Sequence, residues 1–252
     1  MTGRVALVTG AGRGIGRATA LLLAGRGARV MGVARSEDEL AALAAEAPVE
    51  VLAESVATEE GCERIVAETR ARLGPVEILV ANAGLGSAHE RVIWEQDPAL
   101  WRETMAVNLD APFHLTRLAV PDMRGRGWGR IVIVSSTAGV HGGRAESAYD
   151  ASKHGVLGLM RSVAQDVAAE GITCNAVLPG WVRTAMAERS AEVEAARRGR
   201  SVEDVWAERA AEYPAGRVVT SEEVAATIAF LASEEASGVS GEAIKVTLGG
   251  IW

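Results

Sequence analysis

The chain has 252 residues, of which 48% are hydrophobic and 23% are charged, a composition typical of an ordered globular protein with a substantial core. Its formal net charge of −7 counts against nucleic acid as a partner, because phosphates require a basic surface. The sequence shows no signal-peptide pattern, no apolar run near the ~18 residues of a membrane span, and only two cysteines, Cys62 and Cys174, so we expect a cytoplasmic protein without a metal site.

The first predicted strand, 5–8, runs into the glycine-rich segment Thr9-Gly10-Ala11-Gly12-Arg13-Gly14-Ile15-Gly16 and then into a predicted helix, 15–24. Glycines let the backbone approach a pyrophosphate, and the free N–H groups of a helix N-terminus favour its negative charge. The spacing is G-x-x-x-G-x-G and not G-x-G-x-x-G, so a glycine-rich hairpin turn is the alternative. The flanking strand and helix favour a nucleotide-binding turn.

The second predicted strand, 29–34, ends about where an acidic residue would bind the ribose of NAD. This position holds Ala34, followed by Arg35. An arginine can hold a 2′-phosphate with paired, charge-assisted hydrogen bonds, and Arg13 would be a second cation for it. We therefore predict NADP, with two ordinary surface arginines and NAD as the alternative.

The remaining pattern alternates strands with helices. Strands are predicted at 49–53, 78–81, 131–134, 173–178 and 243–246, and helices at 58–73, 101–124, 149–170 and 220–233, with a partly detached helical flap at 185–219. Ser36-Glu37-Asp38-Glu39 and Thr220-Ser221-Glu222-Glu223 have the spacing of capping boxes, and Asp97-Pro98 has the pattern of a helix start. This alternation predicts a single α/β domain, 1–252, with a parallel sheet covered by helices on both faces.

Ligands of such sheets bind beyond the carboxyl ends of the strands. The glycine-rich segment, Asn82, Ser136 and Pro179-Gly180 each directly follow a predicted strand, so we expect them to converge on one edge.

Tyr149 and Lys153 stand four residues apart and therefore share one face of the predicted helix 149–170. A free phenol has a pKa near ~10, and a neighbouring ammonium favours the phenolate and lowers that pKa. Ser136 would orient the group that receives the proton. A solvated helix pair is the alternative for Tyr149 and Lys153, and Asn108, among apolar neighbours, is either a satisfied core amide or a site residue.

Together these segments resemble the short-chain dehydrogenase/reductase family, in the family's order and over essentially the whole chain. The resemblance rests on Thr9-Gly10-x-x-x-Gly14-x-Gly16, Asn82-Ala83-Gly84, Asn108, Ser136, Tyr149-x-x-x-Lys153 and Pro179-Gly180. It implies a Rossmann-type, doubly wound sheet of seven strands, a homotetramer, and hydride transfer between a nicotinamide and a carbonyl or alcohol.

The resemblance also implies roles. Tyr149 would be the general acid in reduction and the base in oxidation, and Lys153 would lower its pKa and hold the nicotinamide ribose. Ser136 would bind the substrate oxygen, and Asn108 would anchor a water of the proton relay. The implied cofactor contacts are Gly10, Gly12, Arg13, Gly14, Ile15, Gly16, Arg35, Ser55, Val56, Asn82, Ala83, Gly84, Tyr149, Lys153, Pro179, Gly180, Val182 and Thr184.

Two departures qualify the resemblance. Ser55-Val56 stands where the family often has Asp-Val. The segments Arg117 to Arg130 and Pro179-Gly180-Trp181-Val182 look like bacterial 3-hydroxybutyrate dehydrogenases, yet that group has Gln, His and Lys at the positions held here by Gly86, Ala138 and Glu146. Because Glu146 would repel a carboxylate, we do not expect that activity.

We therefore predict an NADP(H)-dependent oxidoreductase that interconverts a small-molecule ketone and a secondary alcohol, similar to 3-oxoacyl reductases. An NAD-dependent hydroxy-acid or polyol dehydrogenase is the alternative. A nucleotide-sensing scaffold without catalysis is disfavoured because both Tyr149 and Lys153 are present. Trp181, Met186 and Trp206 would either line the substrate pocket or pack within the flap.

Overall fold

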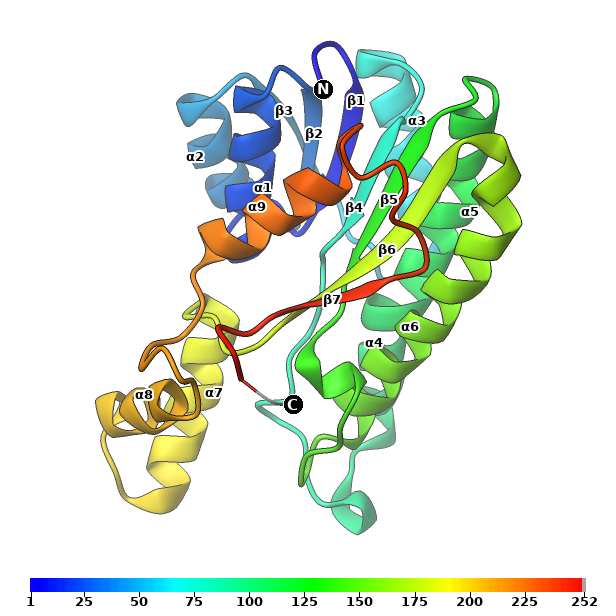
Figure 1. Ribbon diagram of the computed structural model, residues 1–252. Helices are drawn as coiled ribbons and strands as arrows, with labels where there is room; N and C mark the ends of the chain where they lie inside the picture. The colour runs from blue at the N-terminus through cyan, green and yellow to red at the C-terminus, as the bar shows by residue number, and fades with distance from the viewer. Residues whose placement is uncertain (251–252) are drawn as a thin grey trace.

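The computed structural model describes residues 1–250, so positions 251 and 252 of the predicted domain lie outside it. Strands and helices alternate along the chain (Figure 1). The strands are β1 (Val5–Thr9), β2 (Arg29–Ala34), β3 (Val49–Ala53), β4 (Ile78–Ala81), β5 (Gly129–Val134), β6 (Ile172–Pro179) and β7 (Ala243–Val246). The α-helices are α1 (Gly14–Gly25), α2 (Glu37–Glu46), α3 (Glu59–Leu73), α4 (Pro98–Met105), α5 (Ala111–Arg124), α6 (Ser147–Val167), α7 (Ala185–Arg198), α8 (Val202–Ala211) and α9 (Ser221–Leu231).

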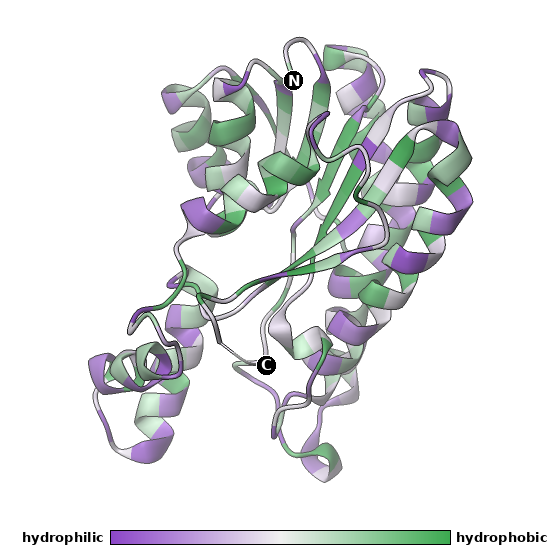
Figure 2. Cartoon of the chain, in the orientation of Figure 1, coloured by the Kyte–Doolittle hydropathy of each residue, from purple (hydrophilic) through white to green (hydrophobic). Residues whose placement is uncertain are grey.

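The strands form one seven-stranded sheet in the order β3-β2-β1-β4-β5-β6-β7, and every neighbouring pair is parallel. Alternate residues of a strand point to opposite faces. In β1, Val5 and Leu7 join the core beneath α3, α5 and α6, whereas Ala6 and Val8 join the core beneath α1, α2 and α9. Figure 2 shows the apolar sides of these helices turned towards the sheet. The predicted doubly wound α/β fold is confirmed.

The order of the strands reverses direction at the centre of the sheet. From β1 the chain moves outward to β2 and β3, and it then returns to β4 on the other side of β1. The connections after β1 and β4 therefore diverge to opposite faces, which opens a crevice at the carboxyl ends of these two strands. This crevice is where the predicted site residues are expected to meet.

The predicted helix start at Asp97-Pro98 is confirmed, but the helix predicted over 101–124 is interrupted. It begins at Pro98, capped by Asp97, whose Oδ1 accepts a hydrogen bond of 2.8 Å from the N–H of Ala99. A π turn, Ala106–Asp110, separates α4 from α5. Pro112 cannot donate to the carbonyl of Asn108, four residues back, and the wider turn follows from this missing donor.

One predicted capping box is complete and the other is not. At Thr220, both reciprocal bonds with Glu223 are present, as predicted. At Ser36, the hydroxyl accepts from the N–H of Glu39 at 3.4 Å, but the Glu39 carboxylate pairs with Arg13 at 2.9 Å instead of returning to the cap. For the Glu39 carboxylate, the guanidinium of Arg13 thus replaces the backbone N–H of Ser36 as hydrogen-bond donor.

The predicted flap consists of α7 and α8, which project from the sheet (Figure 1). Arg209 lies at its centre, 3% exposed, and donates to the carbonyl of Ala187 and to the side chains of Ser190 and Glu194. Its guanidinium lies 3.7 Å from the ring centroid of Trp181. These contacts tie α8 to α7 and to the end of the sheet. No helix of the described residues has the length and apolarity to cross a membrane.

Candidate active site

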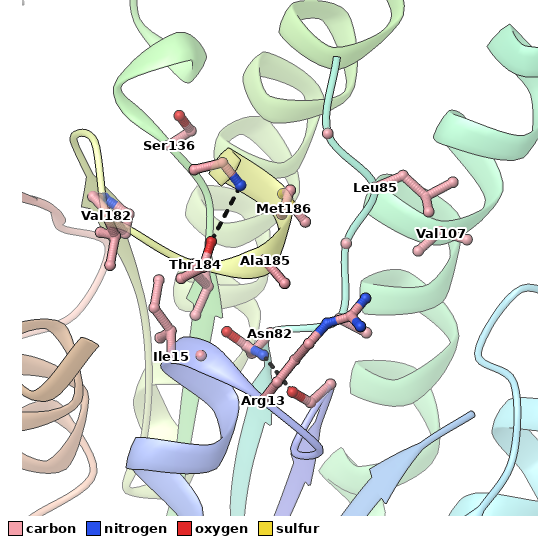
Figure 3. A pocket seen from close by; sticks show the side chains of 18 of the residues that line it. Arg13, Ile15, Asn82, Leu85, Val107, Ser136, Val182, Thr184, Ala185 and Met186 are labelled. Atoms are coloured by element: carbon pink, nitrogen blue, oxygen red, sulfur yellow. Dashed lines mark hydrogen bonds between the residues drawn. The ribbon is translucent and has the colours of Figure 1, made fainter. Parts of the chain in front are cut away.

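A cavity of about 460 Å³ lies along the carboxyl edge of the sheet and contains most of the predicted site residues. Figure 3 shows side chains from separate segments facing this space, among them Arg13, Asn82, Ser136 and Thr184. The predicted residues that line the cavity are Gly10, Gly12, Arg13, Gly14, Ile15, Arg35, Ser55, Val56, Asn82, Ala83, Gly84, Ser136, Tyr149, Lys153, Pro179, Gly180, Val182 and Thr184. Gly16 and Asn108 do not line it and lie behind its wall.

The glycine-rich turn after β1 lines the cavity and is fixed by hydrogen bonds between Thr9 and Asn82. The Asn82 amide donates to the carbonyl of Thr9 at 2.9 Å, while the Thr9 hydroxyl accepts from the N–H of Asn82 at 3.1 Å. Gly10 has a φ of +67°, and a Cβ at Gly16 would overlap the Gly10 carbonyl oxygen, so the turn requires glycine at both positions.

The helix that follows the turn leaves its first N–H groups available. Arg13 is the N-cap of α1 and makes no side-chain capping bond. In contrast, a Ser, Thr or Asp side chain caps each of α2, α3, α4, α7, α8 and α9. An uncapped N-terminus behind a glycine turn can bind a pyrophosphate. These residues therefore fit a dinucleotide.

Charged side chains gather where β2 and β3 end. Arg35 is exposed, lines the cavity, and makes no hydrogen bond or ion pair with the described residues. Arg13 differs, because it is paired with Glu39, which also lines the cavity. Glu54 lines the same end and pairs with Arg64 at 2.7 Å. Only Arg35 of the two predicted cations is thus free for a phosphate.

Tyr149 and Lys153 share one face of α6, and the Lys153 Nζ lies 5.7 Å from the centroid of the phenol ring. Lys153 is 5% exposed, and its Nζ donates to the carbonyl of Val134 at 2.9 Å. The Ser135 hydroxyl donates to the carbonyl of Lys153 at 3.1 Å. Two bonds therefore hold this turn of α6 against the end of β5, where Ser136 also stands.

The pKa of Tyr149 is displaced upward in this structure, opposite to the net direction predicted, and Lys153 is not among the causes of that displacement. Burial raises the pKa of Tyr149 to about 12, against a lowering effect of its hydrogen bond with Ser136, and Glu146 and Asp150 raise it further. Burial also lowers the pKa of Lys153 to about 8. Both charged forms lose hydration here, and the ammonium is directed to a carbonyl, so the phenol keeps its proton.

Asn108 contacts protein and does not reach the cavity. Its Oδ1 accepts from the N–H of Leu85 at 2.8 Å, and its Nδ2 donates to the carbonyl of Leu85 at 3.0 Å and to the Ser152 hydroxyl at 3.1 Å. Ser152 in turn donates to the carbonyl of Tyr149 at 2.7 Å. Both amide protons of Asn108 are thus bonded to protein, and its predicted role as the anchor of a relay water stays a prediction.

The loop after β4 also holds the first turn of α6. Glu90, 1% exposed, accepts hydrogen bonds of 2.8 Å from the N–H groups of Ala148 and Tyr149. Ser87 donates to Glu146 at 2.8 Å. The loop thus fixes the backbone that carries the phenol.

The flap covers one side of the cavity. Of the three predicted pocket residues, Trp181 and Met186 line it and Trp206 does not. Trp206 is 4% exposed and packs within the flap, where its Nε1 donates to Glu188 at 2.5 Å. The sequence pattern could not separate these cases, since the side chain of each is large and apolar and the pattern does not show which way it points.

Several lining residues are absent from the sequence prediction. Glu54 directly follows β3, so the rule that ligands meet the ends of strands would have found it. Ser87 and Tyr213 also line the cavity, but they lie in irregular segments, and only the folded chain brings them to the site.

The match to a family model decides the family. Residues 4–195 match the model described as short chain dehydrogenase. The chain belongs to the short chain dehydrogenase family. The predicted resemblance is confirmed, and with it a family of oxidoreductases.

Short chain dehydrogenases of known function resemble this chain over nearly its full length. The 3-oxoacyl-[acyl-carrier-protein] reductase FabG of Escherichia coli is 36% identical, over 98% of this chain and 97% of the reductase. The D-beta-hydroxybutyrate dehydrogenase of Cupriavidus necator is 35% identical, over 96% and 95%. A crystal structure of a single-residue variant of actinorhodin polyketide ketoreductase with NADPH superposes with a TM-score of 0.93, at 36% identity and 98% coverage of both chains.

Proposed function

We propose that this short chain dehydrogenase is an NADP(H)-dependent reductase of ketones, related in activity to 3-oxoacyl and polyketide ketoreductases. The observation that carries the proposal is the placement of Tyr149, Ser136 and Lys153 on one cavity with the glycine turn. Relatives described as reductases of oxo groups support it.

In the proposed reaction, Ser136, Tyr149 and Lys153 have separate roles. When bound, the nicotinamide supplies or accepts the hydride. Ser136 orients the substrate oxygen, and the phenol of Tyr149 donates its proton to that oxygen in reduction and recovers it in oxidation. Lys153, fixed beside the phenol by the Val134 carbonyl, places a cation next to the group that changes charge.

Arg35 supports the preference for NADP. It lies at the end of β2, makes no bond to the described residues, and meets no acidic residue at the position that would hold a ribose hydroxyl. A guanidinium in this place binds a 2′-phosphate with charge-assisted hydrogen bonds. Arg13 contributes less, because Glu39 competes for it.

Steady-state reduction of ketones with NADPH and with NADH tests this proposal. We expect Tyr149→Phe to lose at least about 100-fold in kcat because the general acid is removed, while NADPH still binds in a fluorescence titration. Arg35→Ala should weaken NADPH at least about tenfold and leave NADH nearly unchanged. Arg29→Ala, an exposed arginine at the other end of β2, is the matched control.

Two outcomes would contradict the proposal. Near-normal turnover of Tyr149→Phe would remove this phenol from the mechanism. An equal loss with both cofactors in Arg35→Ala would favour the alternative, an NAD-linked hydroxy-acid or polyol dehydrogenase. The homotetramer and the cytoplasmic location stay predictions that rest on the resemblance and the composition.

A further inference from the structure

The cavity wall around Tyr149 differs in charge from what a carboxylate substrate needs, although one relative is described as a D-beta-hydroxybutyrate dehydrogenase. The arginines and lysine that line the cavity are Arg13, Arg35 and Lys153. The two arginines stand at the ends of β1 and β2, and Lys153 is bonded to a carbonyl. Near Tyr149, the lining also includes Glu146 and His141. Within residues 1–250, no arginine or lysine of the lining is therefore placed to hold a substrate carboxylate.

Glu146 stands close to the reacting phenol. It lies one turn before Tyr149, is half-buried, and contributes more than any other charge to the raised pKa of that phenol. Its Oε1 accepts from the Ser87 hydroxyl at 2.8 Å, which joins two walls of the cavity. A Cβ at Gly143 would overlap Oε2, so glycine makes room for the carboxylate.

Within residues 1–250, the second oxygen of Glu146 accepts no hydrogen bond and lies beside Gly143, on a residue that lines the cavity. Among residues 1–250, Ser87 is the hydrogen-bond donor that the structure gives to this carboxylate. Burial raises the pKa of Glu146, and Ser87, His141 and Arg209 offset that effect only in part. Arg209 itself is committed to Ala187, Ser190 and Glu194. A ligand that donates a hydrogen bond to Oε2 would stabilise the charge that burial penalises.

We propose that Glu146, oriented by Ser87, selects ketones that carry a hydroxyl or amino group beyond the carbonyl and discriminates against ketones that carry a carboxylate there. This inference rests on the proposed reductase function and names the class of its substrate. A hydroxyl or amino group of the ketone would donate a hydrogen bond to the Glu146 oxygen that has no partner in the part of the chain that the structure describes. A carboxylate of the ketone would instead be repelled by the negative charge of Glu146 in a poorly hydrated site. A hydroxyl and an ammonium group can both donate this hydrogen bond, and the experiment below distinguishes them.

The test uses acetophenones that carry a hydroxymethyl, aminomethyl, ethyl or carboxylate group at the meta or para position. The intact protein is assayed with its preferred cofactor, and binding of each ketone to the cofactor complex is measured by calorimetry. We expect kcat/KM and affinity for the better of the two donor ketones to exceed those for the carboxylate by at least about tenfold. A larger value for the aminomethyl ketone identifies an ammonium, and a larger value for the hydroxymethyl ketone identifies a hydroxyl.

Variants make the assignment specific. Glu146→Gln should reduce the donor-to-carboxylate ratio at least about tenfold, and Glu146→Lys should invert it. Glu50→Gln is the matched control, an exposed glutamate on the edge strand β3 outside the cavity, and should keep the wild-type ratio.

Wild-type preference for the carboxylate, in turnover or in binding, would overturn the inference. An unchanged ratio in a folded Glu146→Gln would overturn it as well. The binding measurement keeps this result separate from the proposed function: donor selection without any turnover would support the role of Glu146 while contradicting the reductase assignment.

Discussion

Burial shifts both Tyr149 and Lys153 towards their neutral forms. The phenol has a pKa of about 12 and the ammonium a pKa of about 8, both displaced chiefly by burial. In the proposed mechanism, a protonated phenol is the form that donates a proton to the ketone oxygen in reduction. Oxidation of an alcohol needs the phenolate, which is scarce until the pH approaches the pKa.

The two directions should therefore depend differently on pH. We expect kcat for alcohol oxidation to rise between pH 7 and pH 10, because the phenolate fraction increases about tenfold per pH unit below the pKa. Reduction should not lose its acid over the same range, since the phenol stays protonated. Initial-rate profiles in both directions, with Tyr149→Phe as the control without this group, measure the effect. An oxidation rate that is flat from pH 7 to pH 10 would contradict it.

The sequence identified the phenol and the amine because their spacing along a helix is a local property. It did not reveal the direction of the pKa displacement, because that direction depends chiefly on burial, and the more distant Glu90 adds to it only once the chain has folded. Asn108 shows the same limit. Its helix is predictable, but its bonds to Leu85 and Ser152 arise from segments distant in the sequence.

At the scale of elements, the turn between β1 and α1 depends on the absence of side chains. We expect Gly16→Ala to weaken NADPH binding at least about tenfold and to cost about 1–3 kcal/mol of stability, because the added Cβ overlaps the Gly10 carbonyl and lies 2.5 Å from the Asn82 amide. Fluorescence titration and thermal unfolding provide the measurements.

Gly25→Ala offers a control in the same helix. A Cβ at Gly25, the last residue of α1, meets nothing within 4 Å. Its alanine variant should bind NADPH normally and unfold at the same or a slightly higher temperature, since alanine favours a helix by up to about 1 kcal/mol. Equal effects of the two substitutions would show that the close approach at Gly16 is not what the turn requires.

Most helices and strands were predictable because their hydrophobic periodicity and the capping, Gly and Pro residues at their ends are local features of the sequence. The two exceptions have different causes: a partner outside the segment in one, and a missing backbone donor within it in the other. Glu39 left its capping box for Arg13, and Pro112 widened the helix into a π turn at Ala106–Asp110. Neither the ion pair nor the wider turn changes the hydrophobic periodicity on which the prediction depended.

At the scale of the whole molecule, the two cysteines report on the integrity of the core. Cys62 in α3 and Cys174 in β6 are fully buried in one hydrophobic cluster, and burial raises the pKa of each thiol to about 12. We expect neither thiol to react with Ellman's reagent in the native protein at pH 8 and both to react in denaturant. Rapid labelling of either thiol in the native protein, with the far-UV signal unchanged, would contradict this burial.

The position of β1 has a consequence for biosynthesis. This strand leaves the ribosome before the other six, yet it occupies the interior of the sheet between β2 and β4. The four-stranded half β3-β2-β1-β4 has all its strands once residue 81 has emerged, whereas β7 can only be added at the rim near the end of translation. The nucleotide-binding half can therefore assemble on the nascent chain. The last strand made, β7, then pairs with the exposed edge of β6.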